Sequence, residues 1–310
     1  DLALGNIAES GRSAGLRWFG PGDGRSEYAA RYREPALFGT RADASVSLEA
    51  QVAESLFTQT RWSTEFGFAP TGASRASLRL ERSGSTYAGP ARGSSATWSV
   101  ALGGGLDRLV PLANPTRGFR AALTALAGRR LDRDPGVPAV SRALFRGNAS
   151  IESAVALARG RVLAFAAHAA GAFLPGGDLP AEELVFVGGS EGLRGHRDRA
   201  FGGSRVAAFS LEHRWITDER GGRLYLFADA ARHDLTGTLA AGGAVLPTTG
   251  DGTAAASSLA RTVLSPGWEF GYGAGLRTRM ASGLVDLNLG FAPGEPLRRA
   301  TIHIRYASTW

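Results

Sequence analysis

The chain has 310 residues, including 43 glycines and no cysteine, and its formal net charge is +7, with arginine as the only basic residue besides histidine. The cysteine count excludes a disulfide framework and a thiolate metal site, and a mean hydropathy of −0.08 argues against a disordered chain. No apolar run approaches the roughly 18 residues of a membrane-spanning helix, which excludes helical membrane proteins.

The arginines are scattered along the chain, and no nucleic-acid-binding motif accompanies them. We therefore expect no nucleic-acid partner and interpret the positive charge as arginines that line a wet interior and its rim. The chain starts at Asp1 with neither Met nor an apolar leader, so we expect an export signal to have been removed.

Alternation with a period of two recurs along the whole chain and predicts strands with one apolar and one polar face. In residues 44–54, Val46 and Leu48 alternate with Ser45, Ser47 and Glu49. The predicted strands are 11–20, 25–36, 41–54, 56–69, 74–88, 94–109, 117–131, 141–157, 160–174, 204–217, 222–233, 268–280, 283–292 and 299–310, with residues 2–9 as part of another.

About fourteen strands with no dividing linker favour one all-β domain over residues 1–310, an antiparallel transmembrane β-barrel rather than a soluble sandwich. Residues 234–267, rich in Gly, Thr, Ala and Ser, are expected to form a mobile external loop. Aromatic residues at strand ends are typical of interfacial girdles: they are Trp18, Tyr28, Trp62, Trp215, Tyr306 and Trp310.

A long loop at about 175–203 separates two of these strands and holds the most distinctive segment of the chain. A Gly-Gly turn at Gly188 and Gly189 precedes a tip that contains Arg194, and acidic residues follow in the next strands. An arginine at the tip of a glycine-hinged loop suggests that the loop folds back into the barrel and is held there by charge.

This segment resembles the loop signature of the BamA/TamA-type outer-membrane barrels, the bacterial surface antigen family. The matching loop residues are Gly188, Gly189, Leu193, Arg194, Gly195 and His196, with Glu212 and Asp229 in the two following strands. The final strand resembles the terminal aromatic signal of outer-membrane barrels, through Tyr306 and Trp310.

The resemblance implies that the loop enters the lumen and that Arg194 pairs with Glu212 and Asp229. It also implies a bacterial outer-membrane protein that inserts or translocates other proteins, without enzymatic activity or cofactors. Its partners would be outer-membrane lipid, lipopolysaccharide, and client or partner proteins.

Three features depart from the family pattern. His196 stands where the family has an aromatic residue, this sequence contains no POTRA repeats before its strands, and we expect it to start one or two strands into the family barrel. The chain is therefore either a trimmed 16-strand barrel or a 14-strand variant. Two alternative functions remain open: an anchor or exporter for an N-terminal domain outside this chain, such as a patatin-like phospholipase, and a passive pore.

Other motifs are weaker. Gly188 to Gly192 match the G-x-S-x-G pattern of a hydrolase nucleophile at Ser190, but no helical period follows. The five histidines lack metal-ligand spacing, so no metal site is expected. Glu182 and Glu183, near Pro180, are expected to be solvated, or to act as counter-charges for divalent ions at the cell surface.

Overall fold

The computed structural model describes residues 2–7, 9–20, 25–53, 56–88, 93–111, 114–190, 192–218, 221–234, 237–240, 244–246, 262–264, 266–280 and 283–308. Within these ranges the fold is all-β, with three short 3₁₀ turns named η1 (Leu37–Gly39), η2 (Ala181–Glu183) and η3 (Leu297–Arg299). Over these residues, no helix has the length and apolar character needed to cross a membrane.

Over the described residues, one antiparallel sheet of fifteen strands makes up most of the molecule, and each of its strands pairs with the next strand of the same sheet. In order, the strands are β1 (Leu2–Ile7), β2 (Arg12–Phe19), β3 (Arg25–Glu34), β4 (Ala42–Ala53), β5 (Phe57–Thr71), β6 (Ser74–Tyr87), β7 (Ser94–Asp107), β8 (Gly118–Arg133), β9 (Val140–Ala158), β10 (Arg161–Phe173), β13 (Arg205–Ile216), β14 (Arg223–His233), β18 (Gly267–Met280), β19 (Gly283–Phe291) and β20 (Thr301–Ser308).

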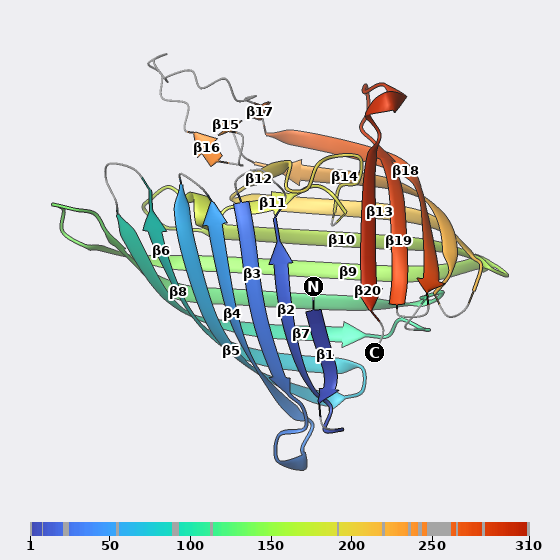
Figure 1. The fold of residues 1–310 in the computed structure, drawn as a ribbon, viewed down its shortest axis with the longest axis horizontal. Helices are drawn as coiled ribbons and strands as arrows, with labels where there is room; N and C mark the ends of the chain where they lie inside the picture. The colour runs from blue at the N-terminus through green and yellow to red at the C-terminus, as the bar shows by residue number, and fades with distance from the viewer. Residues whose placement is uncertain are drawn as a thin grey trace.

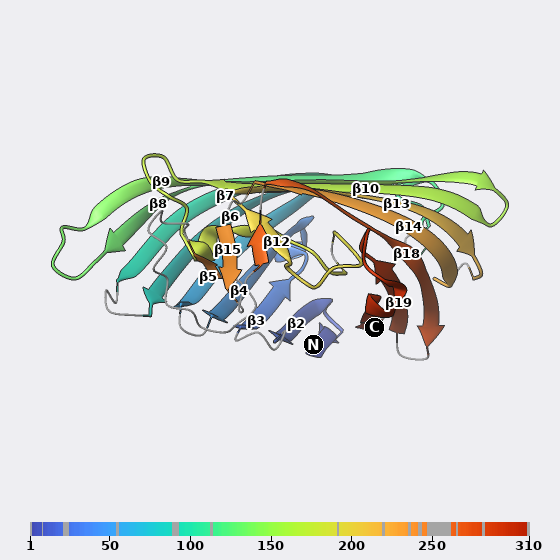
Figure 2. The ribbon, with the colours of Figure 1, turned by 90° about the horizontal axis from the view of Figure 1, so that it is seen from above.

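The sheet is strongly curved and forms a barrel wall (Figures 1 and 2). Seen from above, its two ends turn towards each other, so that the first and last strands lie on opposite sides of a seam. The described residues of β1 and β20 share no hydrogen-bonded register. The seam is therefore the place where the backbone ladder of the wall is interrupted.

The two faces of the wall differ in chemistry, as the alternation predicts. On β4, Val46 is 46% exposed on the outer face, whereas the neighbouring Ser45 is only 5% exposed on the inner face. On β14, Leu224 and Leu226 are exposed outside, while Asp229 is buried inside. An apolar exterior and a polar interior are what a transmembrane barrel requires, so the fold-class prediction is confirmed.

All fourteen predicted strands are present, with bounds that differ by at most two residues from the prediction. The residues predicted as a stub at 2–9 contain a fifteenth strand, β1, which pairs with β2. Residues 234–267 are not simply a loop, because they contain a small sheet of β15 (Gly237–Ala240), β16 (Ala244–Leu246) and β17 (Thr262–Leu264).

Candidate functional site

The segment between β10 and β13, residues 175–203, folds back inside the curve of the wall (Figure 2); we call it the inserted loop. It begins with η2 and continues as a hairpin of β11 (Val185–Val187) and β12 (Phe201–Gly203), which pair with each other. The residues between these two strands form the loop tip.

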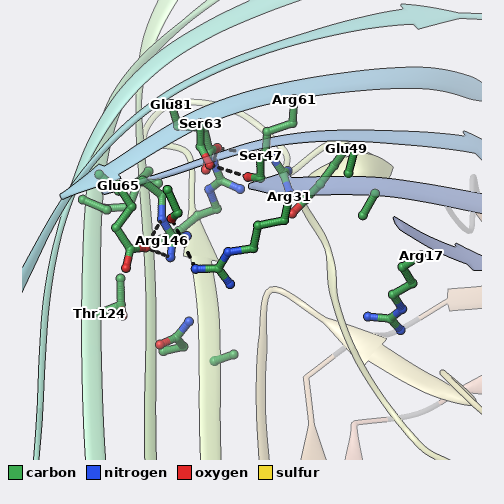
Figure 3. A pocket seen from close by; sticks show the side chains of 18 of the residues that line it. Arg17, Arg31, Ser47, Glu49, Arg61, Ser63, Glu65, Glu81, Thr124 and Arg146 are labelled. Atoms are coloured by element: carbon green, nitrogen blue, oxygen red, sulfur yellow. Dashed lines mark hydrogen bonds and ion pairs between the residues drawn. The ribbon is translucent and has the colours of Figure 1, made fainter. Parts of the chain in front are cut away.

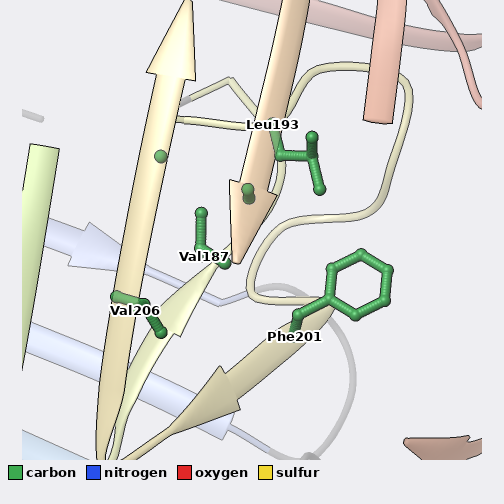
Figure 4. Packing of buried hydrophobic residues seen from close by; sticks show 6 residues of the cluster. Val187, Leu193, Phe201 and Val206 are labelled. Atoms are coloured by element: carbon green, nitrogen blue, oxygen red, sulfur yellow. The ribbon is translucent and has the colours of Figure 1, made fainter. Parts of the chain in front are cut away.

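An apolar cluster fastens the hairpin to the wall (Figure 4). Val187, Leu193 and Phe201 of the loop pack against inward-facing residues of β13 and β14, and Leu193 is fully buried. Burial of a leucine contributes about 1.5–3 kcal/mol. The complete cluster consists of Val187, Leu193, Phe201, Val206, Ala208 and Ala231.

Arg194 lies beside both acidic residues that the sequence singles out. Its Nε and Nη2 donate to the two carboxylate oxygens of Asp229 at 2.8 and 2.7 Å, and its Nη1 donates to Oε1 of Glu212 at 2.6 Å. The backbone nitrogen of Arg194 also donates to Asp229, at 2.9 Å, and Nη2 donates to the hydroxyl of Ser210 at 2.7 Å. We call Arg194, Glu212 and Asp229 the tip anchor.

The tip anchor is buried and well satisfied. The side chains of Arg194, Glu212 and Asp229 are 8%, 11% and 1% exposed. The guanidinium carbon of Arg194 lies 3.7 Å from the ring centroid of Phe227, which fills the lumen below it. The second oxygen of Glu212 accepts a hydrogen bond from Arg214 at 2.7 Å, so both carboxylates have arginine partners.

Glycines of the wall make room for the tip. A Cβ placed on Gly271 of β18 would lie 1.8 Å from the carbonyl oxygen of Arg194, and one on Gly290 of β19 would lie 2.4 Å from the nitrogen of Gly195. Gly195 itself has a φ of +92°, and a Cβ there would lie 2.5 Å from a carbonyl oxygen of Phe291. Only glycine permits this backbone-to-backbone contact.

The remaining residues of the predicted motif shape the tip. Gly188 and Gly189 both have positive φ, and the nitrogen of Gly189 donates to the carbonyl oxygen of Leu193 at 3.1 Å. The ring of His196 packs edge-on against Phe201 with centroids 5.1 Å apart, and its Nε2 lies 2.8 Å from the carbonyl oxygen of Phe270. The histidine therefore keeps an aromatic contact at the position where it departs from the family pattern.

The tip also reaches strands on both sides of the seam. On one side, Arg305 of β20 donates to the carbonyl oxygen of Ser190 at 3.1 Å, and Thr301 donates to that of Gly195 at 3.2 Å. On the other side, Arg199 forms an ion pair with Glu27 of β3. The inserted loop thus links the first and last parts of the sheet across its interrupted ladder.

A second ionic cluster, which the sequence interpretation missed, holds the start of the inserted loop. The side chains of Glu182 and Glu183 in η2 are 0% and 1% exposed, so the expectation that they are solvated is wrong. Nη2 of Arg130 on β8 donates to Glu182 at 2.9 Å, and Nε of Arg146 on β9 lies 3.6 Å from Glu183. We call these four residues the base anchor.

The base anchor is less completely paired than the tip anchor. Tyr87 donates to one oxygen of Glu182, but within the described residues both oxygens of Glu183 and Nη1 of Arg130 lack a hydrogen-bond partner. Burial raises the pKa of Glu183 above its ordinary value, although the charges of Arg146 and Arg61 oppose this shift.

Two further parts of the prediction concern metals and the last strand. Over the described ranges, no group of three His, Asp or Glu side chains could hold a metal ion. Tyr306 is exposed on the outer face of β20, and Trp310 lies outside the described residues.

Comparison with solved structures supports the fold. BamA from Haemophilus ducreyi lacking POTRA domains 1–3 matches with a TM-score of 0.65 and 15% identity, covering 98% of this chain and 65% of that one. CdiB from Escherichia coli matches with a TM-score of 0.60 and 15% identity, covering 99% and 58%. This chain therefore spans less than two thirds of each of these proteins.

No curated protein sequence matches the chain significantly. A family model does match, over residues 10–301, and it describes the Omp85 superfamily domain. With the polar-lined barrel, the inserted loop and the seam on the same residues, the chain belongs to the Omp85 superfamily and is a bacterial outer-membrane β-barrel.

Proposed function

We propose that this barrel inserts proteins into the outer membrane, or moves them across it, without catalysing a chemical reaction. A client segment would enter at the seam between β1 and β20. Unpaired strand edges offer backbone donors and acceptors that template another strand. In lipid every backbone polar group needs a partner, so a client strand gains most by pairing where the wall offers free edges.

The observation that carries this proposal is the position of the inserted loop. It is fixed to β13 and β14 through the tip anchor, and it contacts β20 on one side of the seam and β3 on the other. The ion pair between Arg199 and Glu27 is partly exposed, so it can open while the tip anchor and β20 still hold the loop, and the two edges can then separate. We propose client and partner proteins as its protein contacts, and outer-membrane lipid and lipopolysaccharide as the surroundings of its apolar face.

The contents of the lumen weigh against a passive pore. The loop tip, its apolar cluster and the two anchors occupy the interior, where Leu193, Arg194 and Arg130 are buried. A pore needs a continuous wet path, whereas a barrel that works at its seam does not.

Cross-linking of the seam tests the proposal. The chain has no cysteine. A variant with one cysteine in Leu2–Ile7 and one in Thr301–Ser308 can therefore form only one intramolecular disulfide, which joins the two edges of the seam. With the barrel reconstituted in liposomes, we expect oxidised pairs to block assembly or translocation of a reporter protein and reduction to restore it. Equal activity of the oxidised and reduced forms would contradict opening at the seam.

A further inference from the structure

A polar cavity of about 520 Å³ opens into the lumen beside the first strands, away from the tip anchor (Figure 3). Its charged lining consists of five arginines and three glutamates: Arg17, Arg31, Arg61, Arg79, Arg146, Glu49, Glu65 and Glu81. The cavity therefore has an excess of positive charge.

The excess is located on two residues. Arg79 pairs with Glu65 at 2.6 Å, Arg61 lies between Glu81 and Glu49 at 3.2 and 3.4 Å, and Arg146 pairs with Glu81. Within the described part of the chain, Arg17 and Arg31 form no ion pair with any carboxylate, and the one polar contact of the Arg31 guanidinium is with the hydroxyl of Ser45 at 3.3 Å.

The strand register places no acidic residue directly opposite either arginine, and the diagonal neighbours Glu27 and Glu49 pair with other arginines, Arg199 and Arg61. Gly15 and Ser47 flank Arg31 on the adjacent strands, and Ala29 lies opposite Arg17. Arg17 and Arg31 themselves occupy diagonal positions on β2 and β3, close enough for two long side chains to reach one group. Small neighbours leave the space in front of both guanidiniums open, and Figure 3 shows both side chains extending into it.

Hydroxyl and amide groups also line the cavity. Ser47 and Ser63 share a hydrogen bond of 2.7 Å, and Thr124 and Asn148 face the same cavity from the opposite wall. A planar guanidinium binds a carboxylate through two parallel hydrogen bonds, and hydroxyl and amide groups suit a peptide backbone. The nearby Glu49 is already engaged by Arg61.

We propose that Arg17 and Arg31 form a binding site for carboxylate side chains of an acidic peptide segment, presented inside the barrel two strands from the seam. The assignment rests on the proposed function for the identity of the ligand as a client segment, but the site itself stands on the geometry. A segment that enters past β1 meets the inner faces of β2 and β3 first.

Binding of a synthetic probe tests the site. The probe is a labelled glutamate-rich peptide, and its glutamine-for-glutamate counterpart is the uncharged control. We expect each of Arg17→Gln and Arg31→Gln to weaken binding of the acidic peptide about tenfold, since hydrogen bonds between charged groups are the strong ones. The double variant should also reduce the salt dependence of binding.

The matched control is Arg82→Gln, which removes the same charge from the outer face, where Arg82 packs over Trp98 at 4.9 Å. It should leave peptide binding unchanged. Equal binding of both peptides, or equal loss in the Arg82 variant, would overturn the site. If inorganic phosphate displaces the peptide at the concentration at which it binds alone, the site takes free oxyanions and the peptide assignment is wrong.

The two proposals can fail separately. Loss of peptide binding in the Arg17 and Arg31 variants, in a protein whose cross-linked seam still supports full activity, would keep the site and reject seam opening. If peptide binding survives both substitutions, in a protein whose activity stops when the seam is cross-linked, the binding site is rejected and seam opening is kept.

Discussion

The two anchors of the inserted loop differ in the charge that the loop supplies and in how fully their buried charged groups are hydrogen-bonded. At the tip the loop supplies the cation, and every nitrogen of the Arg194 guanidinium donates to Glu212, Asp229 or Ser210. At the base the loop supplies two carboxylates, and both oxygens of Glu183 lack a hydrogen-bond partner within the described residues. A fully paired buried charge resists removal, whereas an incompletely paired one responds to protons.

The comparison suggests a division of labour along one loop. The tip anchor sits among glycines that admit no other residue, so it defines one position of the loop. The base anchor joins η2 to β8 and β9 through long, flexible side chains. We therefore expect the tip to determine stability and the base to determine how stability depends on pH.

The largest effect should come from Arg194→Ala. It leaves Glu212 and Asp229 buried, and breaking a buried pair by removing one partner costs about 3–5 kcal/mol. Urea unfolding in detergent, or the temperature at which the folded band disappears in a gel, measures the loss. Glu212→Gln should act in the same direction. If both variants unfold like the parent, the tip anchor does not hold the loop.

Arg130→Ala should destabilise less, by about 1.5–3 kcal/mol, the range for hydrogen bonds to charged groups. The substitution removes contacts with Glu182, Tyr87 and Asp132, but the base anchor is already incompletely paired. Combining it with Arg194→Ala tests independence, because separated sites add. A base variant that costs as much as the tip variant would reverse the comparison.

A third variant tests the glycine floor under the tip. Gly271→Ala forces a Cβ against the carbonyl oxygen of Arg194 and should destabilise by about 1–3 kcal/mol, as overpacking does. The control is Gly104→Ala on β7, where a Cβ would meet nothing within 4 Å. The structure predicts accelerated proteolysis of the inserted loop in the Gly271 variant alone.

Sequence and structure agree most closely where a short period governs the outcome. Strand positions follow from alternation, and on β14 the same period places Tyr225 and Phe227 inside the lumen, where both are buried. The tip residues Arg194, Glu212 and Asp229 could be named because a glycine-hinged motif resembles that of a known family. The contacts of Arg199 with Glu27 could not, because they depend on how far the loop enters.

The base anchor shows why the rest was missed. Two adjacent glutamates that follow Pro180 and Ala181 have the composition of a solvated turn, and their partners lie 52 and 37 residues away along the chain. Arg130 and Arg146 give one signal, since arginines at inward strand positions need carboxylates from elsewhere. That signal does not identify which loop supplies them.

The pH response should be a smaller effect and belongs to the base. The pKa of Glu183 is raised in the folded protein. In the pH window between 4.5, the ordinary pKa of the group, and the raised pKa, the folded state therefore binds more protons than the unfolded state. Stability should therefore fall as pH rises through this window, by at most about 1.4 kcal/mol per pH unit. In Glu183→Gln, the free energy of unfolding should no longer show this decrease with pH across the window. The half-exposed lumen residue Glu152 provides the control, because Glu152→Gln should retain the decrease in stability with pH.

The smallest effect on stability should come from the contact between the tip and β3. The side chains of Arg199 and Glu27 are 35% and 24% exposed, so either charge reversal should cost less than about 1 kcal/mol. Function should respond more strongly, because this ion pair joins the loop to the first side of the seam. We expect Glu27→Arg to change the rate at which the barrel assembles a reporter protein at the proposed seam. Adding Arg199→Glu should restore the parent rate, because it recreates the ion pair with exchanged charges. A double variant no better than the single one would show that the contact does not couple the loop to β3, and the strut would then rest on β20 and the tip anchor alone.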